Sequence, residues 1–87
     1  MADDYENNAE QLNQHFGLAV RELREAFRWS QEQLAERADL NRSFIGEIER
    51  GLATPSLITV AKLADALQMP TSSLIEHCET RTNPEAH

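Results

Sequence analysis

The sequence predicts an all-α protein, a single compact domain of five short helices. Three observations lead to this fold class. Apolar residues recur three or four positions apart, which is the spacing of one helix face, without the alternation typical of strands. Residues that cap helices stand before several of these apolar segments. The 87 residues suit one domain, and they contain no internal repeat and no long linker.

The first expected helix begins at about Asn13 and ends near Arg28. Residues 1–11 are acidic and show no apolar period, so we expect a mobile N-terminal extension there. The folded domain is therefore expected to cover residues 12–77. The apolar stripe of the first helix consists of Leu12, Phe16, Ala19, Val20, Leu23 and Phe27.

Two further helices, joined by a tight turn, are expected between Ser30 and Gly51. Ser30 and Gln33 form a capping box, in which each side chain satisfies a free backbone N–H group. Asp39 tolerates the left-handed backbone conformation that the turn requires. Asn41 is a good N-cap for the next helix, and Gly51 stands where a left-handed C-terminal residue is expected. Core positions in these helices are Leu34, Ala35, Ala38, Ile45 and Ile48.

The C-terminal part is expected to form two more helices. Thr54–Pro55–Ser56 starts the fourth helix, with proline at or near the first turn and a hydroxyl residue as the cap. Met69–Pro70 ends this helix, and Thr71 or Ser72 is expected to cap a short last helix. Residues 78–87 are expected to form a polar tail. The expected apolar stripe of the fourth helix comprises Leu57, Val60, Ala61, Ala64 and Leu67.

The formal net charge of −7 is unevenly distributed. Residues 17–75 contain seven basic and eight acidic residues, so most of the negative charge lies in the two ends. No apolar run approaches the roughly 18 residues of a membrane span, and one cysteine, Cys78, cannot form an internal disulfide. We therefore expect a cytoplasmic protein that does not associate with a membrane.

The sequence contains no recognisable catalytic or metal-binding set. His15, His77 and His87 have no second ligand pair at zinc spacing. His77 and Cys78 are adjacent, so they would point about 100° apart on a helix. No nucleophile stands beside a base in a known motif, and there is no glycine-rich phosphate loop. We therefore expect no enzyme, no metal and no cofactor.

Several short motifs occur in a characteristic order: Arg21-x-Leu23-Arg24, Ser30-Gln31-Glu32-x-Leu34-Ala35, Ile45-x-x-Ile48-Glu49-Arg50-Gly51 and Pro55-Ser56-Leu57. In this order and spacing they resemble the lambda/434 repressor and Cro type of DNA-binding domain, the XRE family, over roughly residues 16–75. The resemblance implies a lambda-repressor-like bundle of five helices, in which the second and third helices form a helix-turn-helix.

The resemblance implies that the third helix, about residues 41–50, enters the DNA major groove with its N-terminal side chains toward the base edges. Arg42 can donate two hydrogen bonds to guanine, and Glu47 can accept one from cytosine. Ser43 is the third expected base contact. Gly46 offers no side chain, which would let DNA come close. Phosphate contacts are expected from Gln31, Asn41, Arg50 and Thr54.

The resemblance also implies a structural ion pair. Family members with this pattern pair the positions of Arg24 and Glu49 between the first and third helices, so these residues are expected to hold the fold together. Trp29 is expected to pack between the first two helices. Phe27 lies off the usual core pattern of the family, which indicates partial exposure.

Together these features predict a sequence-specific, DNA-binding transcriptional regulator that acts as a homodimer on a pseudo-palindromic operator. The dimer surface is expected at Met69, Leu74 and Ile75. Two alternatives stay open. One is an antitoxin-like or co-regulator module that binds a regulatory protein partner, favoured by the acidic ends and by Leu52 and Ala53, which replace residues that often meet phosphates. The other is a controller protein of a restriction–modification system.

Overall fold

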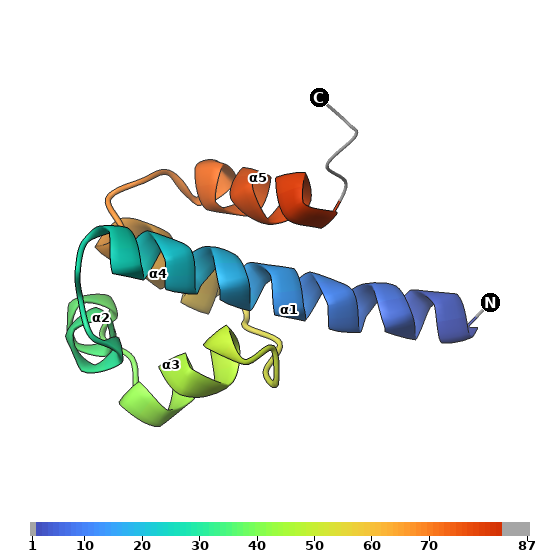
Figure 1. Cartoon of the computed structure of the whole chain (residues 1–87), viewed down its shortest axis with the longest axis horizontal. Helices are drawn as coiled ribbons and strands as arrows, with labels where there is room; N and C mark the ends of the chain where they lie inside the picture. The colour runs from blue at the N-terminus through green and yellow to red at the C-terminus, as the bar shows by residue number, and fades with distance from the viewer. Residues whose placement is uncertain (1, 83–87) are drawn as a thin grey trace.

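The computed structural model describes residues 2–82. Five α-helices make up this part of the chain (Figure 1): α1 (Ala2–Ala26), α2 (Gln31–Ala38), α3 (Arg42–Glu49), α4 (Leu57–Ala66) and α5 (Thr71–Thr82). No strand occurs among the described residues, so the all-α prediction is confirmed. None of these helices is long and apolar enough to cross a membrane. Residue 1 and residues 83–87, parts of the predicted extension and tail, lie outside the described residues.

The first helix is longer than predicted. α1 begins at Ala2 rather than near Asn13, so residues 2–11 continue the helix instead of forming a separate extension. The apolar period indicates burial, and among residues 8–26, whose burial the structure describes, the first buried position is Phe16. No proline or glycine interrupts residues 2–11, so no helix-breaking residue stops the helix from extending further toward the N-terminus. Figure 1 shows the N-terminal turns of α1 projecting beyond the other helices.

The last helix also differs from the prediction. α5 runs to Thr82, and Cys78, the first residue of the predicted polar tail, is buried. Cys78 follows Leu74 by four positions and therefore lies on the same helix face. α5 lies along α1 (Figure 1), and the Cys78 thiol donates to the Leu12 carbonyl oxygen at 3.6 Å. The domain boundary predicted at residue 77 is therefore wrong.

The start of α5 corrects two further predictions. The helix begins at Thr71 directly after Pro70, whose carbonyl oxygen accepts from the backbone N–H groups of Ser73 and Leu74. The predicted cap by Thr71 or Ser72 is therefore wrong.

Leu74 is fully buried within the monomer, so it closes the core and does not contribute to a dimer surface.

α4 begins at Leu57, two residues after Pro55. The Ser56 hydroxyl oxygen accepts from the backbone N–H of Thr59 at 3.1 Å, so Ser56 is the cap and Pro55 precedes it. Leu57 and Ala61 are exposed, contrary to the predicted stripe. The predicted stripe and the stripe that is buried in the structure both obey helical spacing. The contacts of α4 with α2 and α5 therefore decide which residues are buried. The buried positions are Val60, Leu63, Ala64, Ala66 and Leu67.

α1 and α3 cross at Gly17 with their backbones in contact. A methyl group at Gly17 would overlap the Ile48 carbonyl oxygen and would lie 2.8 Å from the Glu49 carbonyl oxygen. Ordinary carbon–oxygen contacts in proteins are about 3.3–3.6 Å, so only a residue without a side chain fits. The crossing holds the C-terminal end of α3 against α1, and it buries Ile45 and Ile48 in the core.

Candidate nucleic-acid interface

Two caps and a left-handed turn fix the helix-turn-helix formed by α2 and α3. The Ser30 hydroxyl oxygen accepts from the Gln33 backbone N–H at 3.1 Å, and Gln33 Oε1 accepts from the Ser30 backbone N–H at 2.8 Å. Asp39 adopts φ 55° and ψ 49°, which is the left-handed conformation. Asn41 Oδ1 accepts from the Ser43 backbone N–H at 2.7 Å and caps α3. These predictions are confirmed, and they set the start of α3 relative to α2.

One edge of α3 faces solvent. Arg42, Ser43 and Glu47 are exposed, whereas Ile45 and Ile48 on the opposite face are fully buried. Among the side chains that the structure describes, no carboxylate forms an ion pair with Arg42. The three predicted base contacts therefore lie on one exposed edge, and the core uses none of their side chains.

A buried network joins α1, α2 and α3 behind this edge. Arg24 Nε and Nη2 donate to the two carboxylate oxygens of Glu49 at 2.7 and 3.0 Å, so the predicted ion pair is present. Arg24 Nη1 donates to the Trp29 carbonyl oxygen at 2.7 Å, and Gln31 Nε2 donates to Glu49 Oε1 at 3.0 Å. The hydrogen bonds to Glu49 raise the pKa of Arg24, so its guanidinium stays charged. Glu49 therefore acts as a structural anchor.

Gln31 and Gly46 have surroundings that differ from the prediction. Gln31 Nε2 donates to Glu49, so one of its two amide hydrogens points inward and is not available to a phosphate. Gly46 is buried, and a methyl group there would lie 3.3 Å from Arg50 Nη1 and 3.7 Å from Gln31 Oε1. The two side chains cover Gly46, so the open space predicted there for DNA is absent.

The remaining predicted phosphate contacts lie at exposed positions. Asn41 and Arg50 are exposed, and the α3 cap uses only the oxygen of the Asn41 amide. Thr54 Oγ1 accepts from Asn13 Nδ2 at 2.7 Å, which ties the loop before α4 to α1, while the threonine hydroxyl hydrogen can still donate. The role of Asn13 was not predictable from local patterns, because 41 positions separate it from Thr54.

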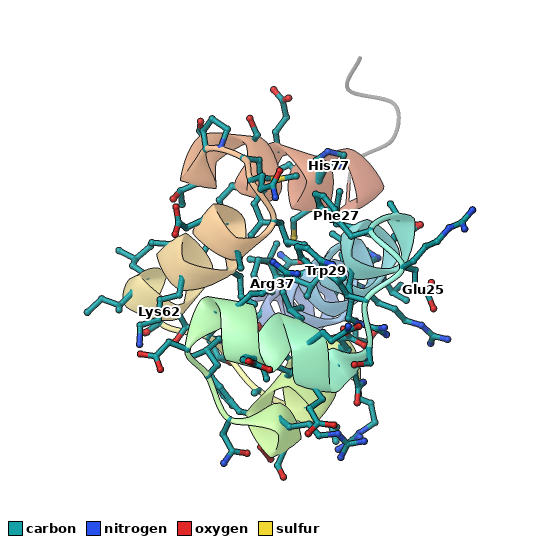
Figure 2. The ribbon with its side chains drawn as sticks, turned by 90° about the vertical axis from the view of Figure 1, so that its left-hand side faces the viewer. Glu25, Phe27, Trp29, Arg37, Lys62 and His77 are labelled. Carbon is teal, nitrogen blue, oxygen red and sulfur yellow. The ribbon has the colours of Figure 1, made fainter. Side chains whose placement is uncertain are left out.

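A stack of side chains closes the corner between α1 and α2 (Figure 2). The rings of Phe27 and Trp29 have centroids 4.3 Å apart and planes at 10°, and the Arg37 guanidinium carbon lies 4.2 Å from the Trp29 ring centroid. Arg28, between the two aromatic residues, has φ 61°. Trp29 packs against the core, as predicted. The stacking of Phe27 and Arg37 on Trp29 was not predicted from helical spacing, because Arg28 has a left-handed backbone and interrupts the helical period there.

The five-helix bundle, the capped turn between α2 and α3 and the exposed edge of α3 together define a helix-turn-helix domain. Comparison with known sequences gives the same class of domain. A helix-turn-helix family model matches residues 20–74, which include α2, the turn and α3. The chain belongs to this family, the XRE or Cro/C1 type of helix-turn-helix proteins.

Two relatives are regulators much longer than this chain. The "HTH-type transcriptional regulator SutR" of Escherichia coli (strain K12) is 30% identical over 73 residues, which cover 84% of this chain and 41% of SutR. The "Immunity repressor protein" of Bacillus phage phi105 is 37% identical over 59 residues, which cover 68% of this chain and 41% of the repressor. This chain therefore spans about two-fifths of the length of either protein.

Two other relatives match over most of their own length. The "Control protein C.BamHI" of Bacillus amyloliquefaciens is 39% identical over 62 residues, which cover 70% of this chain and 76% of that protein. The restriction–modification controller protein C.AhdI from Aeromonas hydrophila has a solved structure similar to this one. It aligns with a TM-score of 0.69 at 44% identity, covering 71% of this chain and 94% of C.AhdI.

Proposed function

We propose that this protein is a sequence-specific DNA-binding transcriptional regulator and that α3 reads base edges in the major groove. The observation that carries the proposal is the division of α3 into two faces. Arg42, Ser43 and Glu47 form an exposed edge, whereas Ile45 and Ile48 lie in the core. A recognition helix needs this arrangement, because base contacts require side chains that a rigid scaffold holds in position.

Each exposed side chain has a matching partner on DNA. Arg42 can donate to guanine O6 and N7, Ser43 can donate or accept, and Glu47 can accept from cytosine N4. Phosphate contacts would position the helix in the groove without selecting a sequence. Their proposed donors are the second amide hydrogen of Gln31, the Asn41 amide, the Arg50 guanidinium and the Thr54 hydroxyl.

The site contains two arginines without a carboxylate partner among the described side chains, although the net charge of the chain is acidic. Arg42 and Arg50 lie at the two ends of α3, and neither forms an ion pair with a described carboxylate. Glu49, in contrast, is neutralised by Arg24. The guanidinium groups on α3 are therefore able to attract phosphates, which dominate the affinity of proteins for DNA.

Selection from random-sequence duplex DNA over several rounds at low salt tests the proposal. A regulator of this kind should enrich one pseudo-palindromic sequence. If no sequence is enriched under conditions where phosphate attraction is strongest, the protein does not read DNA, and a protein-binding function on the same fold becomes the better explanation.

Replacing Arg42 by alanine should weaken binding to the selected sequence by about 1–3 kcal/mol and relax the preference at one base pair. Binding to mixed-sequence DNA should change much less, because guanine recognition contributes nothing to it. Gel-shift titrations with both DNAs measure the difference. Arg28→Ala serves as the control, since Arg28 is exposed but lies in the turn before α2. An equal loss on both DNAs would mean that Arg42 contacts only the backbone.

A homodimer is part of the proposal, because one module of this size contacts about one half-site. The proposed binding surface for the second copy is an apolar groove of about 300 Å³ between α1, α4 and α5. Leu12, Leu57 and Ile75 are the exposed apolar residues that line it. Leu57 and Ile58, at the start of α4, are 82% and 71% exposed, and neighbouring exposed apolar side chains of this kind mark interaction sites. No lining residue belongs to α2 or α3, so a dimer formed here leaves α3 accessible. Thr54 is the one proposed DNA contact that also lines the groove.

Replacing Leu57 by aspartate should dissociate this dimer. Leu57 is 82% exposed and lies in the first turn of α4, where a carboxylate favours the helix while its charge opposes burial in an interface. The dissociation constant should rise at least about tenfold, which is 1.4 kcal/mol, with no loss of thermal stability. Analytical ultracentrifugation measures the change. Leu52→Asp is the control, since Leu52 is also exposed but does not line the groove; equal effects of both variants would exclude the groove.

A controller protein of a restriction–modification system is the second candidate. C.BamHI and C.AhdI are 39% and 44% identical to this chain, compared with 30% for SutR and 37% for the phage repressor. Both candidates bind DNA in the same way. They are separated by mapping the selected sequence: a controller site should lie beside restriction and modification genes, and a site elsewhere would argue against this candidate.

A further inference from the structure

Gly46 lies in the middle of α3, one turn after Arg42, and it is buried although it carries no side chain. Two side chains from different places in the fold cover it. A methyl group at Gly46 would lie 3.3 Å from Arg50 Nη1, 4.0 Å from Arg50 Cζ and 3.7 Å from Gln31 Oε1. Arg50 directly follows α3, so its guanidinium folds back over the helix and does not extend away from its C-terminal end.

Gln31 is held in place on the other side of this gap. Its Nε2 donates to Glu49 Oε1 at 3.0 Å, which directs Oε1 toward Gly46. Glu49 is itself fixed by two hydrogen bonds from Arg24. Arg50 forms no ion pair with a carboxylate among the described side chains. The Arg50 guanidinium and the Gln31 amide oxygen therefore both lie within 4 Å of the space that a methyl group at Gly46 would fill, and Arg50 is exposed, with no carboxylate partner in the described part of the chain.

We propose that Gly46 determines the affinity for DNA by leaving room for Arg50 beside Gln31, so that these two side chains contact one backbone phosphate together. This inference rests on the proposed function. Arginine offers five N–H donors in a planar fork, and Gln31 retains one amide hydrogen that Glu49 does not use. Gly46 is a positioning residue that acts through Arg50, because any side chain at Gly46 would push the guanidinium away from Gln31.

Gly46→Ala tests this arrangement without unfolding the protein. The added methyl group meets the far end of a flexible side chain, and alanine is a better helix former than glycine, so the melting temperature should not fall. Affinity for mixed-sequence duplex DNA at low salt should fall about tenfold, and the slope of log affinity against log salt should decrease by about one, as for one lost phosphate contact. A role for Gly46 in stability alone would leave the salt slope unchanged.

Arg50→Ala and the double variant Gly46→Ala/Arg50→Ala complete the experiment. Arg50→Ala should reproduce the loss, and the double variant should bind no more weakly than Arg50→Ala, because the two changes act on the same contact. Additive losses would overturn the inference, since the methyl group would then meet the DNA directly; unchanged binding by Gly46→Ala would also overturn it. If the parent protein bound neither mixed nor selected DNA, the proposed function itself would fail, which is a different outcome.

Discussion

Replacing Arg24 by alanine should lower the free energy of unfolding by about 3–5 kcal/mol. The change removes two hydrogen bonds to Glu49, whose side chain is 3% exposed, and the donor to the Trp29 carbonyl oxygen. A buried carboxylate without its counter-ion is the costly product. In a domain of this size, each kcal/mol lost from the free energy of unfolding lowers the melting temperature by about 4–8 °C. The melting temperature should therefore fall by more than about 12 °C. Thermal unfolding followed by circular dichroism measures the shift.

Arg21→Ala is the matched control on the same helix. Arg21 pairs with Glu25 at 3.3 Å, but both side chains are more than half exposed, so this pair should contribute about 0.5 kcal/mol or less. Removing Glu49 together with Arg24 should cost less than removing Arg24 alone, because no unpaired buried charge remains. A melting temperature of Arg24→Ala within about 1 °C of the parent would show that the ion pair does not hold the fold together.

Replacing Gly17 by alanine should destabilise the protein by on the order of 3 kcal/mol. Helix propensity alone predicts the opposite, a gain of about 1 kcal/mol. The sign reverses because the methyl group would overlap the Ile48 carbonyl oxygen and lie 2.8 Å from that of Glu49. These are backbone atoms of α3, so the helices must separate. The urea concentration at the unfolding midpoint measures the loss.

Gly46→Ala is the control for this second prediction. It makes the same chemical change in a helix, but the nearest atom belongs to the movable end of the Arg50 side chain. The urea midpoint should therefore hold or rise in Gly46→Ala and fall sharply in Gly17→Ala. If Gly17→Ala were as stable as the parent, α1 and α3 would not cross with their backbones in contact.

The sequence by itself determined the local framework of the helix-turn-helix. The Ser30 capping box and the Asn41 cap use partners at most three positions away, and Asp39 was expected to supply the left-handed turn. Such features are predictable because the hydrogen-bonding groups lie close together in the chain. The family resemblance placed Arg42 on the edge of α3 that is exposed in the structure. Contact of that edge with DNA bases stays a prediction.

The ion pair between Arg24 and Glu49 was predictable only through the family resemblance, since 25 positions separate the two residues. Composition and periodicity contain no information on which distant charges meet. The same resemblance suggested a phosphate contact for Gln31 but not its hydrogen bond to Glu49. The candidate site was therefore predicted as a set of residues, whereas the contacts among them were not.

Tertiary structure alone decided which surfaces are covered. It placed Cys78 and Leu74 in the core, exposed Leu57, and set Gln31 beside Gly46. Each of these results depends on contacts between segments far apart in the chain, such as the 66 positions between Leu12 and Cys78. A helical period shows that one face of a helix is apolar. Only the packing of neighbouring helices determines how far that face is buried and where the buried part of the helix begins and ends.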